Sequence, residues 1–437
     1  MRTEKDKLGT MELEDNVLYG IQTARAAKNF DLKHKKTQMR LINSIVLVKK
    51  AAALTYIKMG IGRDNVYPAI VKACDHILTG NANDAFITEA LQGGAGTSTN
   101  MNVNEVIANL ALQELNYACG RYDIIHPLDD VNRGQSTNDV YPTALRIAAV
   151  QLLRTLSENC AKLQQELQQK ENAFDEIKKL GRTEMMDAVP ITLGQEFGAY
   201  AQAIARDRWR LYKVEERLRQ VNLGGTAVGG GDNAERKYRY KVIEELRDLT
   251  DIGLATAEYP MDITQNNDVF VEVSGLLKAL AVNLMKIAND LRLMNSGPKG
   301  GLGEIKLEAL QLGSTIMPGK INPVIPEMVI QTAMKVIAND TAITMASAHG
   351  EFELNAFMPL IAESLLESLE LLTASTELFR TKCISSLQPN VERCKEILDS
   401  SYAFATAYTT TLGYDEVTAI IEKSGGNTET AKKLLEK

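Results

Sequence analysis

The sequence predicts a mainly α fold built on a few unusually long helices. Apolar residues recur every three or four positions through residues 269–294, which is the spacing of one helix face. At 1.5 Å per residue this helix would be roughly 40 Å long, so it needs partners of similar length to cover its apolar face. Strand signals are sparse, because aromatic residues make up 5% of the chain and no hairpin dipeptide separates two alternating runs.

The long helical patterns occupy the middle of the chain. They cover residues 143–172, 194–221, 269–294, 326–348 and 359–378. The pattern at 269–294 ends at the helix-stopping pair Gly297-Pro298. A glycine-rich segment at 224–231 lacks the flanking strands of a dinucleotide-binding loop, so we interpret it as a flexible connector. We expect the long helices to form one extended bundle.

Changes in this pattern divide the chain into three predicted domains. Residues 1–134 carry shorter helical patterns broken by glycine and asparagine, which indicates a separate helical domain. Residues 135–387 hold the long helices and form the central bundle domain. Residues 388–437 carry short patterns rich in charge, and we interpret them as a small terminal domain.

Composition excludes several classes of function. The formal net charge is −7, whereas nucleic acids and anionic membranes bind basic surfaces, so we expect neither as a partner. The five cysteines are widely spaced and the four histidines are scattered, so we expect no disulfide framework, no metal and no cofactor. The chain has no apolar run of membrane-spanning length and opens on charged residues rather than a signal peptide. We therefore expect a cytoplasmic protein.

A loop at residues 313–323 concentrates polar side chains that can perform chemistry. Glycines and prolines bound it, and between them lie Ser314, Thr315, Lys320 and Asn322. A hydroxyl, a lysine and a carboxamide on one loop can accept a proton and hold a carboxylate. A phosphate-binding loop would need four residues between its glycines and a serine or threonine after its lysine, and this loop has neither feature. A purely structural loop would have no need of these four side chains together.

Three further polar blocks precede predicted helices, where unpaired backbone N–H groups favour anions. They cover residues 93–100, 135–139 and 181–187. Each block alone is more typical of a simple helix cap. Together with the loop at 313–323 they predict a carboxylate-binding site. The candidate ligand-binding residues in these blocks are Thr97, Ser98, Ser136, Thr137, Asn138, Thr183 and Glu184.

The loop at 313–323 resembles the signature loop of the aspartase/fumarase superfamily, Gly-Ser-Ser-x-Met-Pro-x-Lys-x-Asn-Pro, with Thr315 in place of the second serine. The three polar blocks are similar to other characteristic segments of this family, so the resemblance covers nearly the whole chain. Residues 194–197 and 264–268 look closest to its aspartase branch. The resemblance implies a three-domain subunit and a homotetramer with a core of twenty helices, in which three subunits contribute to each active site.

The same resemblance implies a lyase with a small amino- or dicarboxylic acid substrate and no cofactor. The expected reaction is a reversible anti elimination of ammonia from L-aspartate, giving fumarate. Its difficult step is removal of a weakly acidic C–H proton, which produces a dianionic aci-carboxylate that hydrogen-bond donors must stabilise. By resemblance, Ser314 is the general base, and Lys320 and Asn322 bind the carboxylate that does not take this charge. The residues implied to hold the charged carboxylate or to line the leaving-group side are Thr97, Ser98, Ser136, Thr137, Asn138, Thr183, Glu184 and Thr315.

Glu184 is the chief departure from the family pattern, where this position is usually histidine or glutamine. A carboxylate beside the leaving group favours a cationic ammonium over a hydroxyl, which supports release of an amine and also permits a bulkier amine than ammonia. The alternative without a role in the site is that Glu184 is a solvent-facing carboxylate at a helix start. The alternative functions are a fumarate hydratase, another amine lyase of the same superfamily and a non-catalytic bundle protein.

Overall fold

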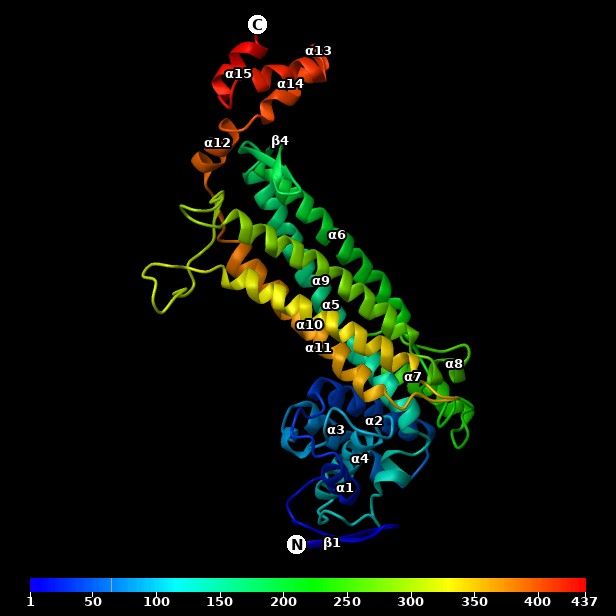
Figure 1. Ribbon diagram of the computed structural model, residues 1–437. Coiled ribbons are helices and arrows are strands. Elements are labelled where there is room, and N and C mark those ends of the chain that lie inside the picture. The colour runs from blue at the N-terminus through cyan, green and yellow to red at the C-terminus, as the bar shows by residue number, and fades with distance from the viewer. Residues whose placement is uncertain (64) are drawn as a thin grey trace. The chain divides into compact units, whose positions relative to one another are not determined.

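The chain folds mainly into α-helices, as the sequence predicts (Figure 1). The computed structural model describes residues 1–63 and 65–437. The α-helices are α1 (Ile21–Asn29), α2 (Met39–Met59), α3 (Val66–Leu78), α4 (Thr97–Glu114), α5 (Thr137–Ala173), α6 (Leu193–Leu218), α7 (Arg236–Thr250), α8 (Pro260–Gln265), α9 (Asp268–Met294), α10 (Val324–Ala348), α11 (Met358–Phe379), α12 (Val391–Asp399), α13 (Thr409–Leu412), α14 (Tyr414–Lys423) and α15 (Thr428–Leu435). Within the described part of the chain, none of them is both long and apolar enough to cross a membrane.

The strands are short and pair two by two. The antiparallel pairs are β1 (Arg2–Asp6) with β2 (Gly9–Leu13), β3 (Lys178–Thr183) with β4 (Met186–Thr192) and β7 (Ile305–Lys306) with β8 (Gln388–Pro389), and the parallel pair is β5 (Gln220–Val221) with β6 (Ala255–Thr256). In the longer hairpin the register pairs Lys178 with Thr192 and Thr183 with Met186, with an irregularity between Leu180 and Arg182. A two-stranded sheet cannot form a core of its own, so these pairs depend on the helices.

Five long helices, α5, α6, α9, α10 and α11, confirm the predicted long patterns. Helix α5 begins at Thr137, six residues before the predicted start, although Pro142 lies inside it. Proline has no N–H, so the carbonyl of Asn138 lacks its usual helical donor. The side-chain amide of Asn222 donates to that carbonyl at 3.0 Å instead, and the helix continues.

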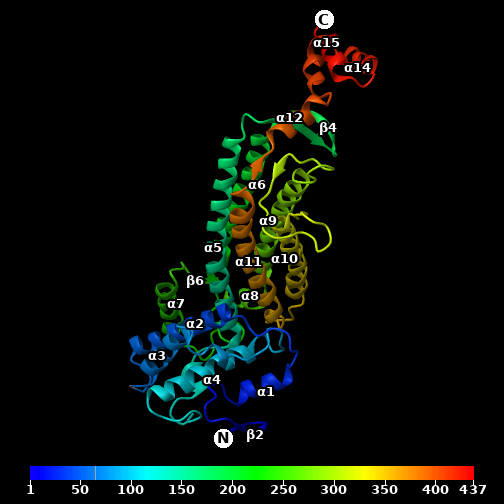
Figure 2. The same ribbon diagram turned by 90° about the vertical axis from the view of Figure 1, so that its left-hand side faces the viewer.

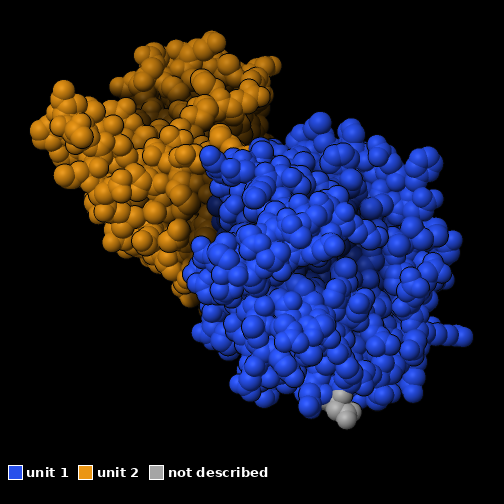
Figure 3. Space-filling model, turned by 90° about the horizontal axis from the view of Figure 1, so that it is seen from below, with its two compact units in different colours: residues 1–155, 210–278, 335–371 blue, residues 156–209, 279–334, 372–437 orange. Residues whose placement is uncertain are grey.

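The chain divides into two compact units, coloured separately in Figure 3. Unit 1 contains residues 1–155, 210–278 and 335–371, and unit 2 contains residues 156–209, 279–334 and 372–437. Each of the five long helices contributes one part to unit 1 and the other part to unit 2. The division into three domains at residues 134 and 387 stays a prediction.

Unit 1 packs its shorter helices around α2, which contacts both α3 and α7, while α3 contacts α4 (Figure 2). The apolar face of α2 is buried through Ile42, Ile45 and Val46. Tyr56 at the end of the same helix stacks on Tyr67 of α3 and on Tyr238 of α7, with ring centroids 5.1 and 4.8 Å apart. Burial of this apolar surface holds the helical part of unit 1 together.

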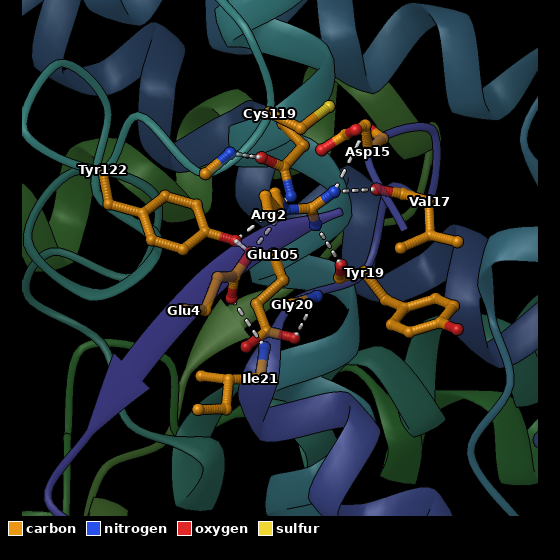
Figure 4. Close-up of polar contacts among 12 residues, drawn as sticks. Arg2, Glu4, Asp15, Val17, Tyr19, Gly20, Ile21, Glu105, Cys119 and Tyr122 are labelled. Carbon is orange, nitrogen blue, oxygen red and sulfur yellow. Dashed lines mark hydrogen bonds and ion pairs between the residues drawn. The ribbon is translucent and has the colours of Figure 1, made fainter. Parts of the chain in front are cut away.

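A buried polar cluster joins the amino-terminal hairpin to α4 (Figure 4). Glu105 of α4 accepts hydrogen bonds from the backbone N–H groups of Gly20 and Thr23. Arg2 forms an ion pair with Glu4 at 2.8 Å and donates to the carbonyl of Tyr19 at 2.7 Å. Burial raises the pKa of the Glu105 carboxyl, and these N–H donors oppose that rise. The cluster fixes the segment before α1 against α4.

The polar block at 181–187 lies in a β-hairpin, so the prediction that it lies at the start of a helix is wrong. Glu184 and Met185 form the two-residue turn between β3 and β4, with φ of 53° and 66°. Two positive φ values match the twist of the flanking strands, and such turns usually contain Asn-Gly or Asp-Gly. The pair Glu-Met carries no such signal in the sequence. The alternative that places Glu184 at a helix start is wrong for the same reason.

Buried charges hold the β3–β4 hairpin within unit 2. Glu304, with no exposed surface, forms ion pairs with Lys179 at 3.0 Å and with Arg182 at 2.9 Å. Lys179 also pairs with Glu196 of α6 at 2.8 Å. Buried charges are costly unless they are paired, so this cluster fixes β3 against the segment that follows α9. Near the carboxyl terminus, α14 packs on α15 around the apolar side chains of Ala405, Val417 and Leu435.

Candidate active site

The first two polar blocks meet in unit 1, at the beginnings of α4 and α5. Gly96 precedes α4 with a φ of 94°, and a side chain there would clash with the ring of Tyr141 of α5, only 2.4 Å from the added carbon. Glycine is therefore required on both counts. The close approach places Nδ2 of Asn100 3.1 Å from Oγ1 of Thr137. Five predicted ligand-binding residues thus gather at two adjacent helix starts: Thr97, Ser98, Ser136, Thr137 and Asn138.

These five residues differ in exposure. Thr97 is exposed, Ser98, Ser136 and Asn138 are partly buried, and Thr137 is buried with 8% of its surface exposed. Oγ of Ser136 accepts a hydrogen bond from the backbone N–H of Asn138 at 3.2 Å. The first N–H groups of both helices and these hydroxyls provide donors, which is the arrangement that binds a carboxylate.

Asp139 fixes the turn that carries Ser136 and Thr137, although nothing in the sequence distinguishes it from an ordinary residue of a polar helix start. Its carboxylate has no exposed surface and accepts the backbone N–H of Ser136 at 3.0 Å, of Gly224 at 3.0 Å and of Thr226 at 2.9 Å. Burial raises the pKa of Asp139 to about 6, although these donors oppose the rise. The segment at 224–231 is therefore tied to the site at two backbone positions, and its interpretation as a flexible connector is wrong.

Lys49 of α2 is a second functional candidate that the sequence did not reveal. It is 1% exposed, and its ammonium donates to Oδ1 of Asn132 at 2.7 Å and to Oε1 of Gln135 at 2.9 Å. Burial lowers the pKa of Lys49 to about 7, with Asp139 opposing that change. A buried lysine this close to the turn predicted to bind a ligand is a candidate functional residue. In the sequence, Lys49 beside Lys50 has the appearance of an ordinary helix-surface residue.

The loop at 313–323 in unit 2 is closed by its own hydrogen bonds. The backbone N–H of Gly313 donates to the carbonyl of Lys320 at 2.7 Å, and the side-chain amide of Asn322 donates to the carbonyl of Gly313 at 2.9 Å. Oγ of Ser314 accepts the backbone N–H groups of Ile316 at 3.1 Å and Met317 at 2.9 Å. Ser314 is partly buried, and Thr315 and Lys320 are exposed. The loop therefore presents a serine oxygen that already accepts two N–H donors.

A cavity of about 790 Å³ in unit 2 lies beside this loop. Lys320 and Asn322 line it, together with the segment that follows α9. Arg292 and Lys306 add positive charge to the wall, partly offset by Glu308 and by Glu327, which lies 3.7 Å from Arg292. The size and the cationic groups suit a small anionic ligand.

Thr183 and Glu184 are exposed at the tip of the β3–β4 hairpin, in unit 2. The predicted site residues thus form two sets. Unit 1 carries Thr97, Ser98, Ser136, Thr137 and Asn138, and unit 2 carries Thr183, Glu184, Ser314, Thr315, Lys320 and Asn322. In the described part of the chain, no group of three or more histidine, cysteine or acidic side chains is arranged to hold a metal ion.

Known proteins with a similar sequence and fold are lyases of the family that the loop at 313–323 resembles. A family model described as "Lyase" matches residues 9–338. The chain belongs to this lyase family, the aspartase/fumarase superfamily, to which the loop at 313–323 and the polar blocks also point. Its helices and short hairpins match solved lyases along almost their entire length. The fumarate lyase:delta crystallin of Brucella melitensis bound to cobalt aligns with a TM-score of 0.95 and 43% identity, covering 99% of this chain and 95% of that one.

The sequence identity to individual relatives differs between an ammonia-lyase and a fumarase of the family. The aspartate ammonia-lyase of a Bacillus species is 44% identical over 434 residues, which are 99% of this chain and 93% of that enzyme. The recombinant class II fumarase of Schistosoma mansoni aligns with a TM-score of 0.94 and 32% identity, covering 99% of this chain and 95% of that one. The sequence identity is therefore higher to the ammonia-lyase than to this fumarase.

Proposed function

We propose that the protein is an aspartate ammonia-lyase that converts L-aspartate reversibly into fumarate and ammonia. The similarity to a curated aspartate ammonia-lyase over nearly the whole chain supports this substrate. The structural observation that carries the mechanism is the environment of Ser314, whose Oγ accepts two backbone N–H groups within its own loop. These dipoles favour the alkoxide over the neutral hydroxyl, because they stabilise negative charge on the oxygen.

In this mechanism Ser314 removes a proton from the carbon next to one substrate carboxylate. The electron pair of the broken C–H bond moves into that carboxylate and gives the aci-carboxylate dianion. The dianion then collapses, the carbon–carbon double bond forms, and the C–N bond breaks on the opposite face to release the amine. Lys320, on the same loop, binds the other carboxylate and adds positive charge near Ser314, which further favours the alkoxide. Asn322 closes the base of the loop through Gly313 and lines the same cavity.

The helix starts in unit 1 supply the donors for the aci-carboxylate. Thr97 and Ser98 begin α4, and Ser136 and Thr137 begin α5, so hydroxyl and backbone N–H donors converge on one region. Preorganised donors of this kind stabilise charge as it develops, and loss of one typically slows a reaction by about 10²–10³-fold. Thr315 adds a hydroxyl from the loop. Asn138 lies at the leaving-group side, together with the two hairpin residues described next.

Thr183 and Glu184 belong to the leaving-group side in this proposal. The hairpin turn holds Glu184 in a left-handed backbone conformation, and Glu184 is exposed there. A carboxylate favours a substrate ammonium group over the neutral hydroxyl of malate. The enzyme is therefore expected to eliminate an amine in preference to water.

We further propose that the active enzyme is a homotetramer in the cytoplasm. The two sets of site residues then come together between subunits, with the loop of one subunit closing over the helix starts of others. A net charge of −7 suits a protein whose partner is a small acid rather than a polyanion, because a polyanion needs a basic surface.

An activity assay with L-aspartate tests the proposed function. The purified protein should produce fumarate, measured by its ultraviolet absorbance, and an equal amount of ammonia. Ser314→Ala should reduce kcat by at least about 10²–10⁴-fold, the usual contribution of a general base. Ser401→Ala is the matched control, because Oγ of Ser401 also accepts a backbone N–H, from Ala403, outside the loop. Malate turnover exceeding aspartate turnover would identify a fumarate hydratase instead.

A further inference from the structure

The Thr137 hydroxyl can serve a carboxylate only if it donates its hydrogen. Its Oγ1 lies 3.1 Å from Nδ2 of Asn100, and an amide nitrogen of this kind only donates. Oγ1 therefore accepts this bond, and the hydroxyl hydrogen is left for a ligand. If the Asn100 amide were turned around, its Oδ1 would face Thr137 and take that hydrogen.

Asn132 holds Asn100 in the productive orientation. Oδ1 of Asn132 accepts Nδ2 of Asn100 at 3.2 Å and Nδ2 of Asn104 at 3.2 Å. A reversed Asn100 would therefore set two amide oxygens against each other. In the observed orientation, Oδ1 of Asn100 has no hydrogen-bond partner among the described residues, although Asn100 is only 2% exposed. A buried amide oxygen without a hydrogen bond is costly, so another residue must hold the Asn100 side chain in this orientation.

Lys49 supplies that constraint. The Asn132 amide donates to the carbonyl of Gln135 at 3.1 Å, and its Oδ1 accepts Nζ of Lys49 at 2.7 Å. An ammonium group has only donors, so Asn132 must present its oxygen to Lys49 and hence to Asn100. Nζ of Lys49 donates a second hydrogen bond to Oε1 of Gln135 at 2.9 Å. The neutral amine still has two N–H groups for both bonds, and the Asn132 amide nitrogen is already bonded to the Gln135 carbonyl, so Oδ1 of Asn132 stays on the Lys49 side.

We propose that Lys49 is a positioning residue that acts through Asn132 and Asn100 to make Thr137 a hydrogen-bond donor to the substrate. This inference rests on the proposed function, because that function places a substrate carboxylate at Thr137. No proton or charge is transferred along the chain of side chains. Lys49 fixes only the direction in which each hydrogen bond runs.

A double-mutant cycle separates this role from a structural one. Lys49→Met removes the donors at similar volume and should lower kcat/KM for L-aspartate by about 10–10²-fold. The same substitution made together with Thr137→Val should change kcat/KM by less than about 3-fold relative to Thr137→Val alone, because no hydroxyl is left to orient. Lys49→Gln keeps an N–H donor and should recover part of the loss. Thr55 is buried on the same helix, and the Ala51 carbonyl is the one hydrogen-bond partner of its hydroxyl among the described residues, so Thr55→Val should leave kcat/KM unchanged.

Equal fold losses from Lys49→Met in both backgrounds would overturn the proposal, as would full activity of folded Lys49→Met. If Lys49→Met does not fold, Asn100→Asp decides the question. It keeps the shape but places an acceptor opposite Thr137, so kcat/KM should fall at least as far as in Thr137→Val, and a folded variant with wild-type kcat/KM would refute the relay. If the wild type does not act on L-aspartate, the proposed function fails separately. The same cycle is then read from the calorimetric affinity for fumarate, where additivity again refutes the relay.

Discussion

At the scale of single residues, ion-pair and hydrogen-bond partners decide whether a partly buried charge is favoured in the folded protein. Glu367 of α11 is an example. Its carboxylate pairs with Lys335 and, at 2.5 Å, with Lys35, and it accepts the amide of Asn339 at 2.9 Å. Burial alone would raise the pKa of Glu367, but these donors outweigh it and lower the pKa to about 2.

The lowered pKa of Glu367 predicts a pH-dependent stability. Because the folded-state pKa lies below the ordinary value of 4.5, the stabilisation is complete above about pH 4.5 and is lost as the pH falls toward 2. Glu367→Gln should therefore lower the free energy of unfolding by about 1 kcal/mol at pH 7, a value that allows for solvent screening. The difference from wild type should shrink below pH 4.5. Urea unfolding at pH 7 and pH 3.5 measures both, with Glu258→Gln at an exposed position as the control. A difference independent of pH would contradict the ion-pair explanation.

The sequence points to candidate residues with obvious chemistry and misses candidates that are marked only by their burial. Ser314, Lys320 and Asn322 are recognisable because a glycine- and proline-bounded loop has no structural need of them. Lys49 and Asp139 are not recognisable, because their roles depend on partners 83 to 87 positions away in the chain. Periodicity along one helix contains no information about such contacts.

At the scale of elements, Asn222 compensates for a proline inside a helix. Pro142 leaves the Asn138 carbonyl of α5 without a helical donor, and the Asn222 side chain replaces that donor. Asn222→Leu should lower the free energy of unfolding by about 2–3 kcal/mol, because a buried hydrogen bond to Thr264 and a partly buried one to the Asn138 carbonyl are lost.

Restoring the missing N–H group at position 142 should reduce the destabilisation caused by Asn222→Leu. Pro142→Ala restores an N–H for the Asn138 carbonyl, so Asn222→Leu should cost about 1 kcal/mol less in that background. Denaturant midpoints of the four proteins in this cycle give the coupling. An identical cost in both backgrounds would mean that Asn222 serves Thr264 alone.

The long helices were predictable and the hairpin between α5 and α6 was not, for a physical reason. A stripe of apolar residues over 26 positions fixes both the type and the length of an element such as α9. The turn of the β3–β4 hairpin has positive φ at Glu184 and Met185, yet neither residue favours that conformation. The turn is imposed by the buried ion pairs of β3, which no local pattern reveals.

The strain at this turn is testable. Met185→Gly should raise the free energy of unfolding by about 0.5 kcal/mol, because glycine adopts a positive φ without steric cost, although it loses more entropy on folding. Ala188→Gly in β4, where φ is not positive, should lower it by about 0.5–1 kcal/mol. Urea denaturation compares the two. Equal destabilisation by both substitutions would show that the left-handed turn stores no strain.

At the scale of the whole molecule, the site residues are distributed over two units of the chain, and the proposed tetramer explains why. Thr137 lies in unit 1 and Ser314 in unit 2. If each active site takes Thr137 and Ser314 from different subunits, a mixed tetramer can contain intact sites even when every subunit is defective. A monomeric enzyme cannot recover activity in this way.

Complementation between two defective variants therefore tests the assembly. Ser314→Ala and Thr137→Val should each retain at most about 1% of wild-type activity alone, with L-aspartate as substrate. After mixing in equal amounts, unfolding and refolding, about one quarter of the sites should combine an intact loop with an intact α5, so roughly a quarter of wild-type activity should return. Mixing without unfolding is the control and should restore little activity while the tetramers stay intact. Ser314→Ala refolded with Lys320→Met should stay inactive, because both changes lie on one loop. No recovery in the first mixture would show that the two sets of residues do not meet across a subunit boundary. Recovery in the second mixture would show that regained activity does not depend on combining the two sets.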